Sequence, residues 1–595
     1  MKRTHNCGKL RKENVEETVT LCGWVDRRRD LGGIIFIDLR DKYGKTQVVF
    51  NPEHNPDVHE VADALRNEFV IQITGKVQAR PEGMINEKLP TGTIDIMVDE
   101  LVILNKSETS PLSINDHNEV SKEGDDVRLK YRFLDLRRPW NQKKILLKSK
   151  FLQNSREFFA KHDFEDIETP ILCKSTPEGA RDYLVPSRVN PGQFYALPQS
   201  PQTYKQLLMI AGFDRYYQIA KCFRDEDLRA DRQPEFTQID VEMSFVEQED
   251  ILSTFDDYIS EVLPKTWPDL KVELPIERMP YEEAMMDYGS DKPDLRFGLK
   301  IKDVSDIAAT CGFGVFKAVA GSGGAVRGIA ATGCVDFTRK TIDELTKFVG
   351  RYGAKGLVWM RVLEDGSVES QVAKFFKPEE IIAMKERLGG QPGDMLFFIA
   401  ADEQTTANSL GHLRLEVAKL KGLMDSSVRK FVWITDFPMF EYSENEGRYT
   451  SMHHPFTAPF DEHIENFESG NLKEMKSKAY DLVLNGVEIG GGSIRIHNPE
   501  IQQKAFKALG LSEEEVEQKF GYFVNAFKYG APPHGGLAFG LDRIVATMEG
   551  VDSIRDFIPF PKTSTAASLM ENCPSPVDSQ QLLDVHVSVN VPSED

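Results

Sequence analysis

Cysteine is scarce in this sequence, and its few copies are not spaced to bind a metal. Seven cysteines are scattered through 595 residues without a CxxC pair, and the twelve histidines form no HExxH motif. This pattern is typical of reduced cytoplasmic thiols, and it argues against both a disulfide framework and a zinc site. Basic residues are also in the minority. The 73 Lys and Arg against 94 Asp and Glu give a net charge of −21, which argues against non-specific binding to nucleic acid.

Long apolar runs are missing as well. No run approaches the roughly 18–20 residues that span a bilayer, and the start MKRTHNCGKL has no apolar signal-peptide core, so we expect a cytoplasmic protein without a membrane partner. The glycine-rich run GSGGAVRG (321–328) lacks both the GK[ST] ending of a phosphate loop and a true GxGxxG spacing, and we interpret it as a turn. The length excludes a single hydrophobic core and predicts several domains.

The first 110 residues have the pattern of a small barrel. Five strand patterns and one helical pattern occur, at 19–25, 33–41, 45–50, 69–79 and 93–104 for the strands and 57–67 for the helix. This number of strands matches the OB barrel, whose face binds oligonucleotides. Trp24, Arg29, Phe36 and Gln47 are candidates for a platform that stacks and hydrogen-bonds unpaired bases. An equally weighted alternative places Trp24 and Phe36 in the barrel core.

A second folded region follows a polar stretch. Residues 141–162 have a strong amphipathic helix pattern, and the apolar segment 164–172 after them is expected to be a strand. Pro170 within that segment implies an edge strand or a subunit boundary. From about 290 to 425 the pattern changes to alternating helices and strands without a reactive cluster, and we interpret this region as an inserted domain.

The most informative segment is the strand pattern at 236–244. Its odd positions are mostly apolar, whereas its even positions are Phe236, Gln238, Asp240, Glu242 and Ser244. A strand directs these two sets to opposite faces. The ordinary interpretation of the polar set is a solvated face. The arginines that precede it, including Arg224, instead favour a binding site for a ligand with phosphate and amine groups.

Three further clusters accompany this strand. Gln202 and Lys205 lie about one helical turn apart, a pairing that is more often surface decoration. Asp481 and Glu488, in a glycine-interrupted strand region, suit magnesium better than zinc. Arg543 falls in the first turn of a helix, where an anion also meets the helix N-terminus. Each cluster alone is weak, but together they predict an active site.

These motifs resemble those of class II aminoacyl-tRNA synthetases. The segment ending at Pro170 resembles motif 1, CFRDED…EFTQIDVEMSF (222–245) resembles motif 2, and GLAFGLDR (536–543) resembles motif 3. TPEGARDY (176–183), ALPQSPQ (196–202) and the OB-like N-terminus narrow the resemblance to the aspartyl-tRNA synthetases of bacterial type. The resemblance extends over essentially the whole chain.

The resemblance implies an α+β multidomain fold with a catalytic domain built on an antiparallel sheet. The divisions that it implies are an OB-fold anticodon-binding domain at 1–110, a linker at 111–140, the catalytic domain at 141–288 and 426–565, an inserted α+β domain of bacterial type at 289–425, and a C-terminal extension at 566–595. A homodimer is implied by the motif 1 interface of the family.

The resemblance also implies ATP-dependent ligation of L-aspartate to tRNA(Asp). The aspartate α-carboxylate attacks the α-phosphorus of ATP to give aspartyl-adenylate, and the aspartyl group then passes to the terminal adenosine of the tRNA. Arg224, Glu488 and Arg543 are implied to be catalytic, and the adenine is expected to lie between Phe236 and Arg543. The positions implied to bind ATP are Arg224, Asp225, Glu226, Gln233, Phe236, Glu488, Gly540, Leu541, Asp542 and Arg543.

The amino-acid site and the metal site follow from the same motifs. The implied aspartate contacts are Glu178, Gln202, Lys205, Arg224, Asp240, His454 and Arg495. Lys205 and Arg495 are expected to bind the side-chain carboxylate, and Glu178, Gln202 and Asp240 the ammonium group. Asp481 and Glu488 are expected to hold Mg²⁺ on the phosphates, and no zinc is expected.

Recognition of tRNA is assigned to the barrel. Arg29, Phe36 and Gln47 are implied to contact the anticodon. A histidine in the RRRDxGG loop accompanies relaxed tRNA recognition in this family, and Leu31 at that position favours the discriminating form, whereas Gly83 in the neighbouring loop does not decide. The alternative is an enzyme that also charges tRNA(Asn).

Two rival functions share much of this pattern. An asparaginyl- or lysyl-tRNA synthetase has the same barrel and motifs, but the set of Gln202, Lys205 and Arg495 disfavours it. A non-catalytic RNA-binding paralogue would keep only the fold, yet every charged position that the chemistry requires is present.

Overall fold

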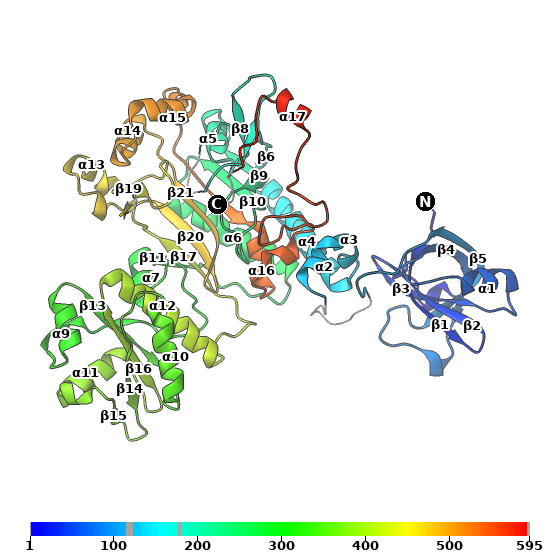
Figure 1. The fold of residues 1–595 in the computed structure, drawn as a ribbon, viewed down its shortest axis with the longest axis horizontal. Helices are drawn as coiled ribbons and strands as arrows, with labels where there is room; N and C mark the ends of the chain where they lie inside the picture. The colour runs from blue at the N-terminus through cyan, green and yellow to red at the C-terminus, as the bar shows by residue number, and fades with distance from the viewer. Residues whose placement is uncertain (1, 115–122, 177–179, 445, 592–595) are drawn as a thin grey trace. The chain divides into compact units, whose positions relative to one another are not determined.

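A computed structural model describes residues 2–114, 123–176, 180–444 and 446–591 (Figure 1). The chain divides into two compact units. One comprises Met1–Gln142 with Ser568–Cys573, and the other comprises Lys143–Ala567 with Pro574–Asp595. Within the described ranges, none of the helices has the length and apolar character that crossing a membrane requires.

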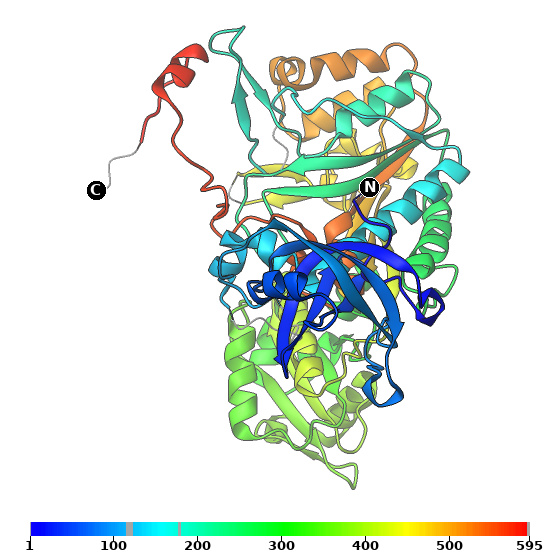
Figure 2. The same cartoon turned by 90° about the vertical axis from the view of Figure 1, so that its right-hand side faces the viewer.

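The first unit contains a closed five-stranded barrel, drawn in blue in Figures 1 and 2. The barrel order is β1-β2-β3-β5-β4. Its strands are β1 (Thr18–Leu31), β2 (Ile34–Asp41), β3 (Gly44–Phe50), β4 (Val70–Ala79) and β5 (Ile94–Asn105), and helix α1 (Pro56–Asp63) lies between β3 and β4 in the chain. The side chains of Ile35, Ile37 and Leu39, at alternate positions of β2, are buried in the hydrophobic core of the barrel. The predicted OB fold is confirmed.

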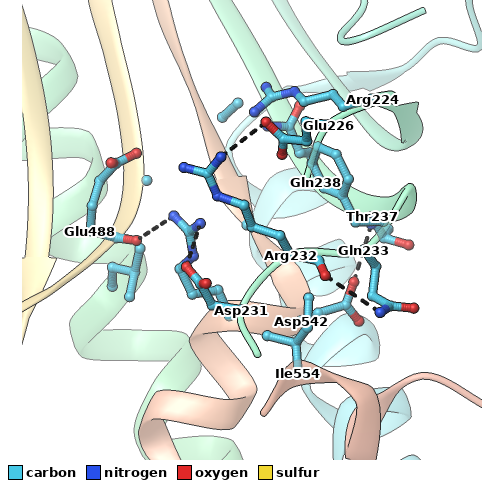
Figure 3. Close-up of a pocket in the computed structure, with 16 residues that line it drawn as sticks. Arg224, Glu226, Asp231, Arg232, Gln233, Thr237, Gln238, Glu488, Asp542 and Ile554 are labelled. Atoms are coloured by element: carbon cyan, nitrogen blue, oxygen red, sulfur yellow. Dashed lines mark hydrogen bonds and ion pairs between the residues drawn. The ribbon is translucent and has the colours of Figure 1, made fainter. Parts of the chain in front are cut away.

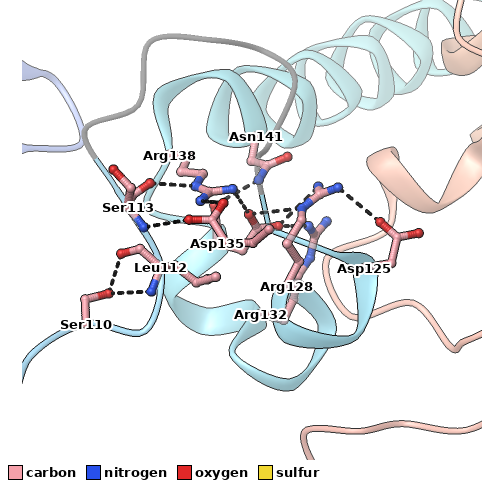
Figure 4. A network of polar contacts seen from close by, with 10 residues as sticks. Ser110, Leu112, Ser113, Asp125, Arg128, Arg132, Asp135, Arg138 and Asn141 are labelled. Atoms are coloured by element: carbon pink, nitrogen blue, oxygen red, sulfur yellow. Dashed lines mark hydrogen bonds and ion pairs between the residues drawn. The ribbon is translucent and has the colours of Figure 1, made fainter.

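A buried ion network organises the segment that was expected to be a linker (Figure 4). This segment contains the short helices α2 (Asp125–Lys130) and α3 (Arg132–Asp135) and leads into α4 (Pro139–Lys161). Asp135 is fully buried and accepts hydrogen bonds from Arg132 Nη1 at 2.6 Å and from Arg138 Nη1 at 3.0 Å. Arg128 Nη2 contacts the same carboxylate at 3.4 Å. Several charged side chains of this segment therefore form an internal network.

The second unit is built on an eight-stranded sheet with the order β11-β17-β20-β21-β22-β10-β9-β6. The strands are β6 (Glu165–Asp166), β9 (Arg215–Phe223), β10 (Glu235–Ser244), β11 (Glu277–Pro280), β17 (Phe431–Thr435), β20 (Ala479–Leu484), β21 (Val487–Ile494) and β22 (His534–Gly540). The sheet is antiparallel at its centre, as expected. Its two edge pairs, β11 with β17 and β6 with β9, are parallel, so the sheet is mixed.

Helices pack on the apolar face of this sheet. Ile239, Val241 and Met243 of β10 join one core with residues of α4, α6 (Gln248–Thr266) and α16 (Leu541–Met548). Helix α5 (Gln202–Ile210) contacts the opposite, polar face through the ion pair of Lys205 with Asp240. The predicted alternation along β10 is confirmed, and its polar face is covered by protein rather than solvated.

The strand expected at 164–172 is much shorter than predicted. Only Glu165 and Asp166 pair with the sheet, at its edge. Pro170 has no N–H to donate to a neighbouring strand, and Ile171 and Leu172 beyond it are exposed. A separate hairpin of β7 (Leu184–Pro186) and β8 (Phe194–Ala196) follows.

The region expected to be an insertion forms a five-stranded sheet with helices on both faces. The order is β12-β13-β16-β14-β15. The strands are β12 (Lys302–Asp303), β13 (Ala325–Ala331), β14 (Val358–Val362), β15 (Val368–Glu369) and β16 (Met395–Ala401), and the helices are α8 (Ser305–Thr310), α9 (Gly314–Gly321), α10 (Arg339–Gly350), α11 (Pro378–Leu388) and α12 (Glu403–Leu420). Along β16, Phe397 and Ile399 enter one core and Leu396 and Phe398 enter the other. The glycine-rich run joins α9 to β13 through a turn at Gly323, where φ is +83°.

The remaining elements surround the large sheet or follow it in the chain. They are α7 (Tyr281–Tyr288), β18 (Phe440–Ser443), β19 (Arg448–Ser451), α13 (Asn466–Ser469), α14 (Pro499–Ala508), α15 (Glu513–Phe527) and α17 (Ser579–Asp584). The exact domain boundaries proposed from the sequence stay predictions.

Replacing Asp135 with Ala is expected to loosen the segment around α2 and α3. The change leaves buried arginines without their shared carboxylate, which costs about 3–5 kcal/mol. Hydrogen exchange of the amides at 128–142 measures the loss as faster local opening. The control is Asp125→Ala at a side chain that is 58% exposed, where we expect less than about 1 kcal/mol. Equal protection in both variants would refute the structural role of the network.

Candidate functional site

Three adjoining cavities lie around the polar face of β10, and Arg224 lines all of them. The first has a volume of about 220 Å³ and is shown in Figure 3, where Glu488 faces it from β21, Gln238 lies on β10 and Arg224 follows β9. The second has a volume of about 360 Å³, and its lining contains both acidic and basic side chains. The third, of about 210 Å³, is lined by Gln202, Tyr204 and Tyr522, among other residues.

The five residues on which the sequence prediction depends meet in the second cavity. Its lining includes Lys205, Arg224, Asp240, Glu488 and Arg495. They come from helix α5, from strands β10 and β21 and from the loops next to these strands. Residues separated by almost 300 positions in the sequence therefore share one cleft.

A buried lattice of alternating charges forms the floor of this cavity. Lys205 Nζ lies 2.7 Å from Asp240 Oδ1 and 3.4 Å from Glu242 Oε2. Arg495 donates two hydrogen bonds to Glu242, from Nε to Oε1 at 2.9 Å and from Nη2 to Oε2 at 3.0 Å. Burial opposes the charge of Glu242, but Arg495 and Lys205 outweigh it and lower the pKa of this carboxyl. The strand alternation placed Glu242 on the polar face, but it gave no sign of these two partners.

Several buried polar atoms of the cavities have no hydrogen-bond partner among the described residues. They are Asp240 Oδ2, Gln202 Nε2 and Arg224 Nε. Buried polar groups are normally bonded, so an acceptor and two donors left open in one place mark a ligand site. One negative and one positive side chain are among them, which suits a ligand that carries both charges.

The two adjacent histidines both face the cavities. Burial and then the charge of Arg495 lower the pKa of His454 well below its usual range, so the ring is neutral. Arg495 Nη1 donates to its Nε2 at 2.9 Å. The His453 ring packs edge-on to Phe437 with centroids 4.6 Å apart. His453, which the sequence analysis left without a role, lines two cavities.

The first cavity pairs an aromatic ring with guanidinium groups. Phe236 and Arg543 both line it, and the Arg224 guanidinium lies 5.0 Å from the Phe236 ring centroid. Arg543 Nη1 donates to the backbone oxygen of Glu488 at 3.0 Å, which fixes its orientation. Flat cationic and aromatic surfaces of this kind stack on planar bases.

The other positions implied for ATP are divided between the cavity and its surroundings. Glu226, Gln233 and Gly540 line the cavity. Asp542 also lines it, although its carboxylate is held by Lys148 and by the N–H of Thr237. The Leu541 side chain lies in the hydrophobic core, and Asp225 is not among the lining residues and pairs with Arg181 at 3.4 Å. Glu178 falls outside the described residues.

The acid pair sits on neighbouring strands of the hairpin β20–β21. Asp481 pairs in register with Gly491, where a Cβ atom would come within 2.3 Å of Asp481 Oδ1, so the glycine is required for close approach. Burial and then the charges of Glu488 and Asp291 raise the pKa of Asp481 well above its usual range. In the described part of the chain, no three acidic, histidine or cysteine side chains are grouped to hold a metal ion by themselves. Two carboxylates still fit Mg²⁺ when phosphate oxygens complete the set.

The anticodon candidates lie on the outer face of the barrel. Arg29 Nη2 contacts Asp38 at 2.5 Å and Gln47 Oε1 at 3.1 Å, and Phe36 pairs in register with Arg29 on the neighbouring strand. Neither Phe36 nor Trp24 belongs to the buried barrel core. Leu31 is 63% exposed, and Gly83 has open space around its Cα.

Comparison with known proteins identifies both parts of the chain. The family described as class II tRNA synthetases (D, K and N) matches residues 124–564, and the family described as OB-fold nucleic acid binding domain matches residues 19–104. An Aspartate--tRNA(Asp/Asn) ligase of Desulfatibacillum aliphaticivorans is 56% identical over 589 residues, which cover 99% of this chain and 98% of the relative. One of the same name from Caldanaerobacter subterraneus subsp. tengcongensis is 53% identical over 591 residues, or 99% of each chain.

Solved structures of similar fold belong to the same group. An asparaginyl-tRNA synthetase of Pyrococcus horikoshii complexed with asparaginyl-adenylate aligns with a TM-score of 0.58 at 17% identity, covering 94% of this chain and 98% of that one. An aspartyl tRNA synthetase from Entamoeba histolytica aligns with a TM-score of 0.55 at 19% identity, covering 92% and 89%. At such identities the likeness concerns the fold.

Replacing Glu242 with Gln is expected to make folding less sensitive to acid. Burial alone would favour the neutral acid, but the two cations hold the folded pKa of Glu242 below 4.5. A carboxylate with a lowered folded pKa stabilises the protein above its unfolded pKa, and this stabilisation is lost as the pH falls through the folded value. Urea unfolding at about pH 7 and about pH 4 should therefore show the advantage of the wild type shrinking at the lower pH. A constant advantage would contradict this assignment.

Proposed function

Since this chain belongs to the class II tRNA synthetases of the aspartate, lysine and asparagine group, we propose that it ligates L-aspartate to tRNA with ATP through an aspartyl-adenylate. One observation carries the proposal. The cavity that contains Lys205, Arg495 and the open carboxylate oxygen of Asp240 adjoins a cavity with stacking surfaces for a base, and Arg224 lines both.

The first step forms the adenylate at the junction of the two cavities. The α-carboxylate of aspartate attacks the α-phosphorus of ATP, a P–O bond forms, and pyrophosphate leaves with the electrons of the broken P–O bond. Arg224 neutralises the charge that builds on the pentacoordinate phosphorus. Asp481 and Glu488 would hold Mg²⁺, which neutralises phosphate charge when bound. In the second step a ribose hydroxyl of the terminal adenosine of the tRNA attacks the aspartyl carbonyl carbon, an ester C–O bond forms, the hydroxyl proton is released, and AMP leaves with the electrons of the broken C–O bond of the adenylate. No covalent enzyme intermediate is needed, and catalysis rests on positioning.

Selection of aspartate follows from the charges. Lys205 and Arg495 bind the side-chain carboxylate, and Arg495 Nη1, which donates to His454 and to Ser493 Oγ in this structure, would exchange one of these partners for the carboxylate. The neutral amide of asparagine would leave buried positive charge uncompensated, which is costly. Asp240 Oδ2, together with Gln202 and Glu178, receives the ammonium group. His454 completes the wall beside Arg495.

We further propose that the enzyme charges both tRNA(Asp) and tRNA(Asn). Leu31 alone favours the discriminating form. The relatives, however, are named Aspartate--tRNA(Asp/Asn) ligases at 53–56% identity over nearly the full chain, and these names favour the broader specificity. Arg29, Phe36 and Gln47 are the proposed anticodon contacts, with Phe36 stacking on a base.

A cytosolic homodimer is the proposed state of the enzyme. The seven cysteines carry free thiols, in keeping with a reducing compartment. Large apolar side chains are exposed directly after Pro170, the end of the segment that resembles motif 1. They are Ile171 at 49% exposure and Leu172 at 52%. Exposed apolar patches of this kind favour association.

Replacing Arg224 with Ala is expected to reduce aspartate-dependent exchange of pyrophosphate into ATP by roughly 100-fold or more, because it removes the cation at the reacting phosphate. The matched control is Arg229→Ala, an exposed arginine of the same segment that is not among the residues lining the cavities. Thermal melting establishes that both variants fold. Full exchange activity in Arg224→Ala would reject the role of this residue.

Charging assays on the two purified tRNAs test the specificity. We expect kcat/KM values within about tenfold of each other, a difference of at most about 1.4 kcal/mol. A much larger preference for tRNA(Asp) would restore the discriminating form that Leu31 suggests. Asparagine in place of aspartate should support no exchange.

A further inference from the structure

The connection between the large sheet and the inserted region runs past the active site. We call residues 289–299 the tether, because they lead from α7 to the start of the inserted sheet. Asp291 of the tether lines the same cavity as Asp481 and Glu488. The neighbouring Lys292 forms a long ion pair with it, with Nζ 3.7 Å from Oδ1, so its negative charge still acts on the cavity. No motif of the sequence includes this residue.

The tether rests on the turn that joins the two strands of the acid pair. Gly486 in this turn has a φ of +85°, and a Cβ atom there would lie 3.2 Å from Asp294 Cβ. Asp294 is buried and bonded to Arg296, with Nη2 to Oδ2 at 2.6 Å. A shift of the tether would therefore move against the hairpin that carries Asp481 and Glu488.

Arg414 of helix α12 clamps the tether from the inserted side. It is 1% exposed, and the oxygens that it bonds are backbone carbonyls of the tether: Nη2 donates to Asp294 at 2.8 Å and Gly298 at 3.0 Å, and Nε donates to Leu299 at 3.2 Å. Its guanidinium also lies 4.5 Å from the Phe297 ring centroid and 4.8 Å from that of Tyr288. Burial lowers its pKa to about 10, which leaves it charged at neutral pH.

The helix and the tether approach each other without intervening side chains. A Cβ atom on Gly411 of α12 would lie 2.7 Å from the carbonyl oxygen of Gly289, and one on Gly289 would lie 2.1 Å from that of Ala407. The contact is rigid because backbone meets backbone. The inserted region thereby fixes the path of the tether from its first residue onward.

We propose that the inserted region positions Asp291 at the acid pair, where its charge strengthens the binding of the divalent cation that accompanies ATP. This rests on the proposed function. Asp291 acts through its field and not as a metal ligand, since the described residues contain no ready-made set of three ligands. Arg414 is a positioning residue, because it acts on the cation through the placement of Asp291.

The first test removes the charge of Asp291 with little change of shape. In Asp291→Asn, the Mg²⁺ concentration for half-maximal exchange should rise roughly three- to tenfold, as expected for one partly screened charge near a dication, and high Mg²⁺ should restore the rate. Electron paramagnetic resonance of Mn²⁺ added to the enzyme with a non-hydrolysable ATP analogue should show the same weakening without turnover. Glu283→Gln, an exposed site on α7, removes an equal charge away from the cavity and should change neither.

The second test asks whether the inserted region acts through Asp291. Arg414→Met should weaken Mn²⁺ binding as Asp291→Asn does, and the double variant should be no weaker than either alone. If Arg414→Met does not fold, Gly411→Ala, which pushes α12 from the tether, takes its place. An Asp291→Asn enzyme with unchanged Mn²⁺ affinity and Mg²⁺ dependence would overturn the inference. Additive effects in the double variant would overturn the part assigned to Arg414. A wild type without aspartate-dependent exchange would instead reject the proposed function.

Discussion

The buried contact of Glu242 with Arg495 and Lys205 is the constraint on which the site depends. Each of these charges is removed from water, and a buried charge is tolerated only when its partners are in place. Glu242 comes from β10, Lys205 from α5, and Arg495 follows β21. The three elements must therefore pack in one arrangement, and that arrangement fixes the outline of the second cavity, the one proposed to bind the amino acid. The polar face of the central strand is thus both the structural centre of the sheet and the floor of the site.

The sequence predicted those parts of the molecule that are encoded locally. Alternation along 236–244 identified the two faces of β10, and the five strand patterns identified the barrel. Contacts between residues that are distant in the chain could not be predicted from the sequence. Glu242 had no assigned partner because Arg495 lies 253 positions away. The strand predicted at 164–172 was too long. The prediction gave more weight to the apolar residues of this segment than to the missing N–H of Pro170. The ion network around Asp135 was not predicted, because buried and solvated charges look alike in a sequence. Asp291 lay outside every motif.

The inserted region is an independent layer structure with an architectural link to the catalysis. Its sheet is buried on both faces, so it has hydrophobic cores of its own. What connects it to the site is a short stretch of backbone held by one buried guanidinium. Arg414 donates its hydrogen bonds to backbone carbonyls of the tether. It therefore fixes the course of this backbone and does not neutralise a charged side chain. The region can therefore differ in sequence over most of its surface while the course of the tether is preserved.

The place of Arg224 where three cavities meet has a consequence for how substrates arrive. Its guanidinium borders the cavity proposed for the nucleotide, the cavity proposed for the amino acid and the third cavity. Whichever small molecule enters first and immobilises this side chain spares the next one the entropy of ordering it. Occupancy of one compartment is then thermodynamically linked to occupancy of its neighbours, and this linkage is reciprocal. An enzyme built in this way responds to the joint supply of its substrates, not to each in isolation.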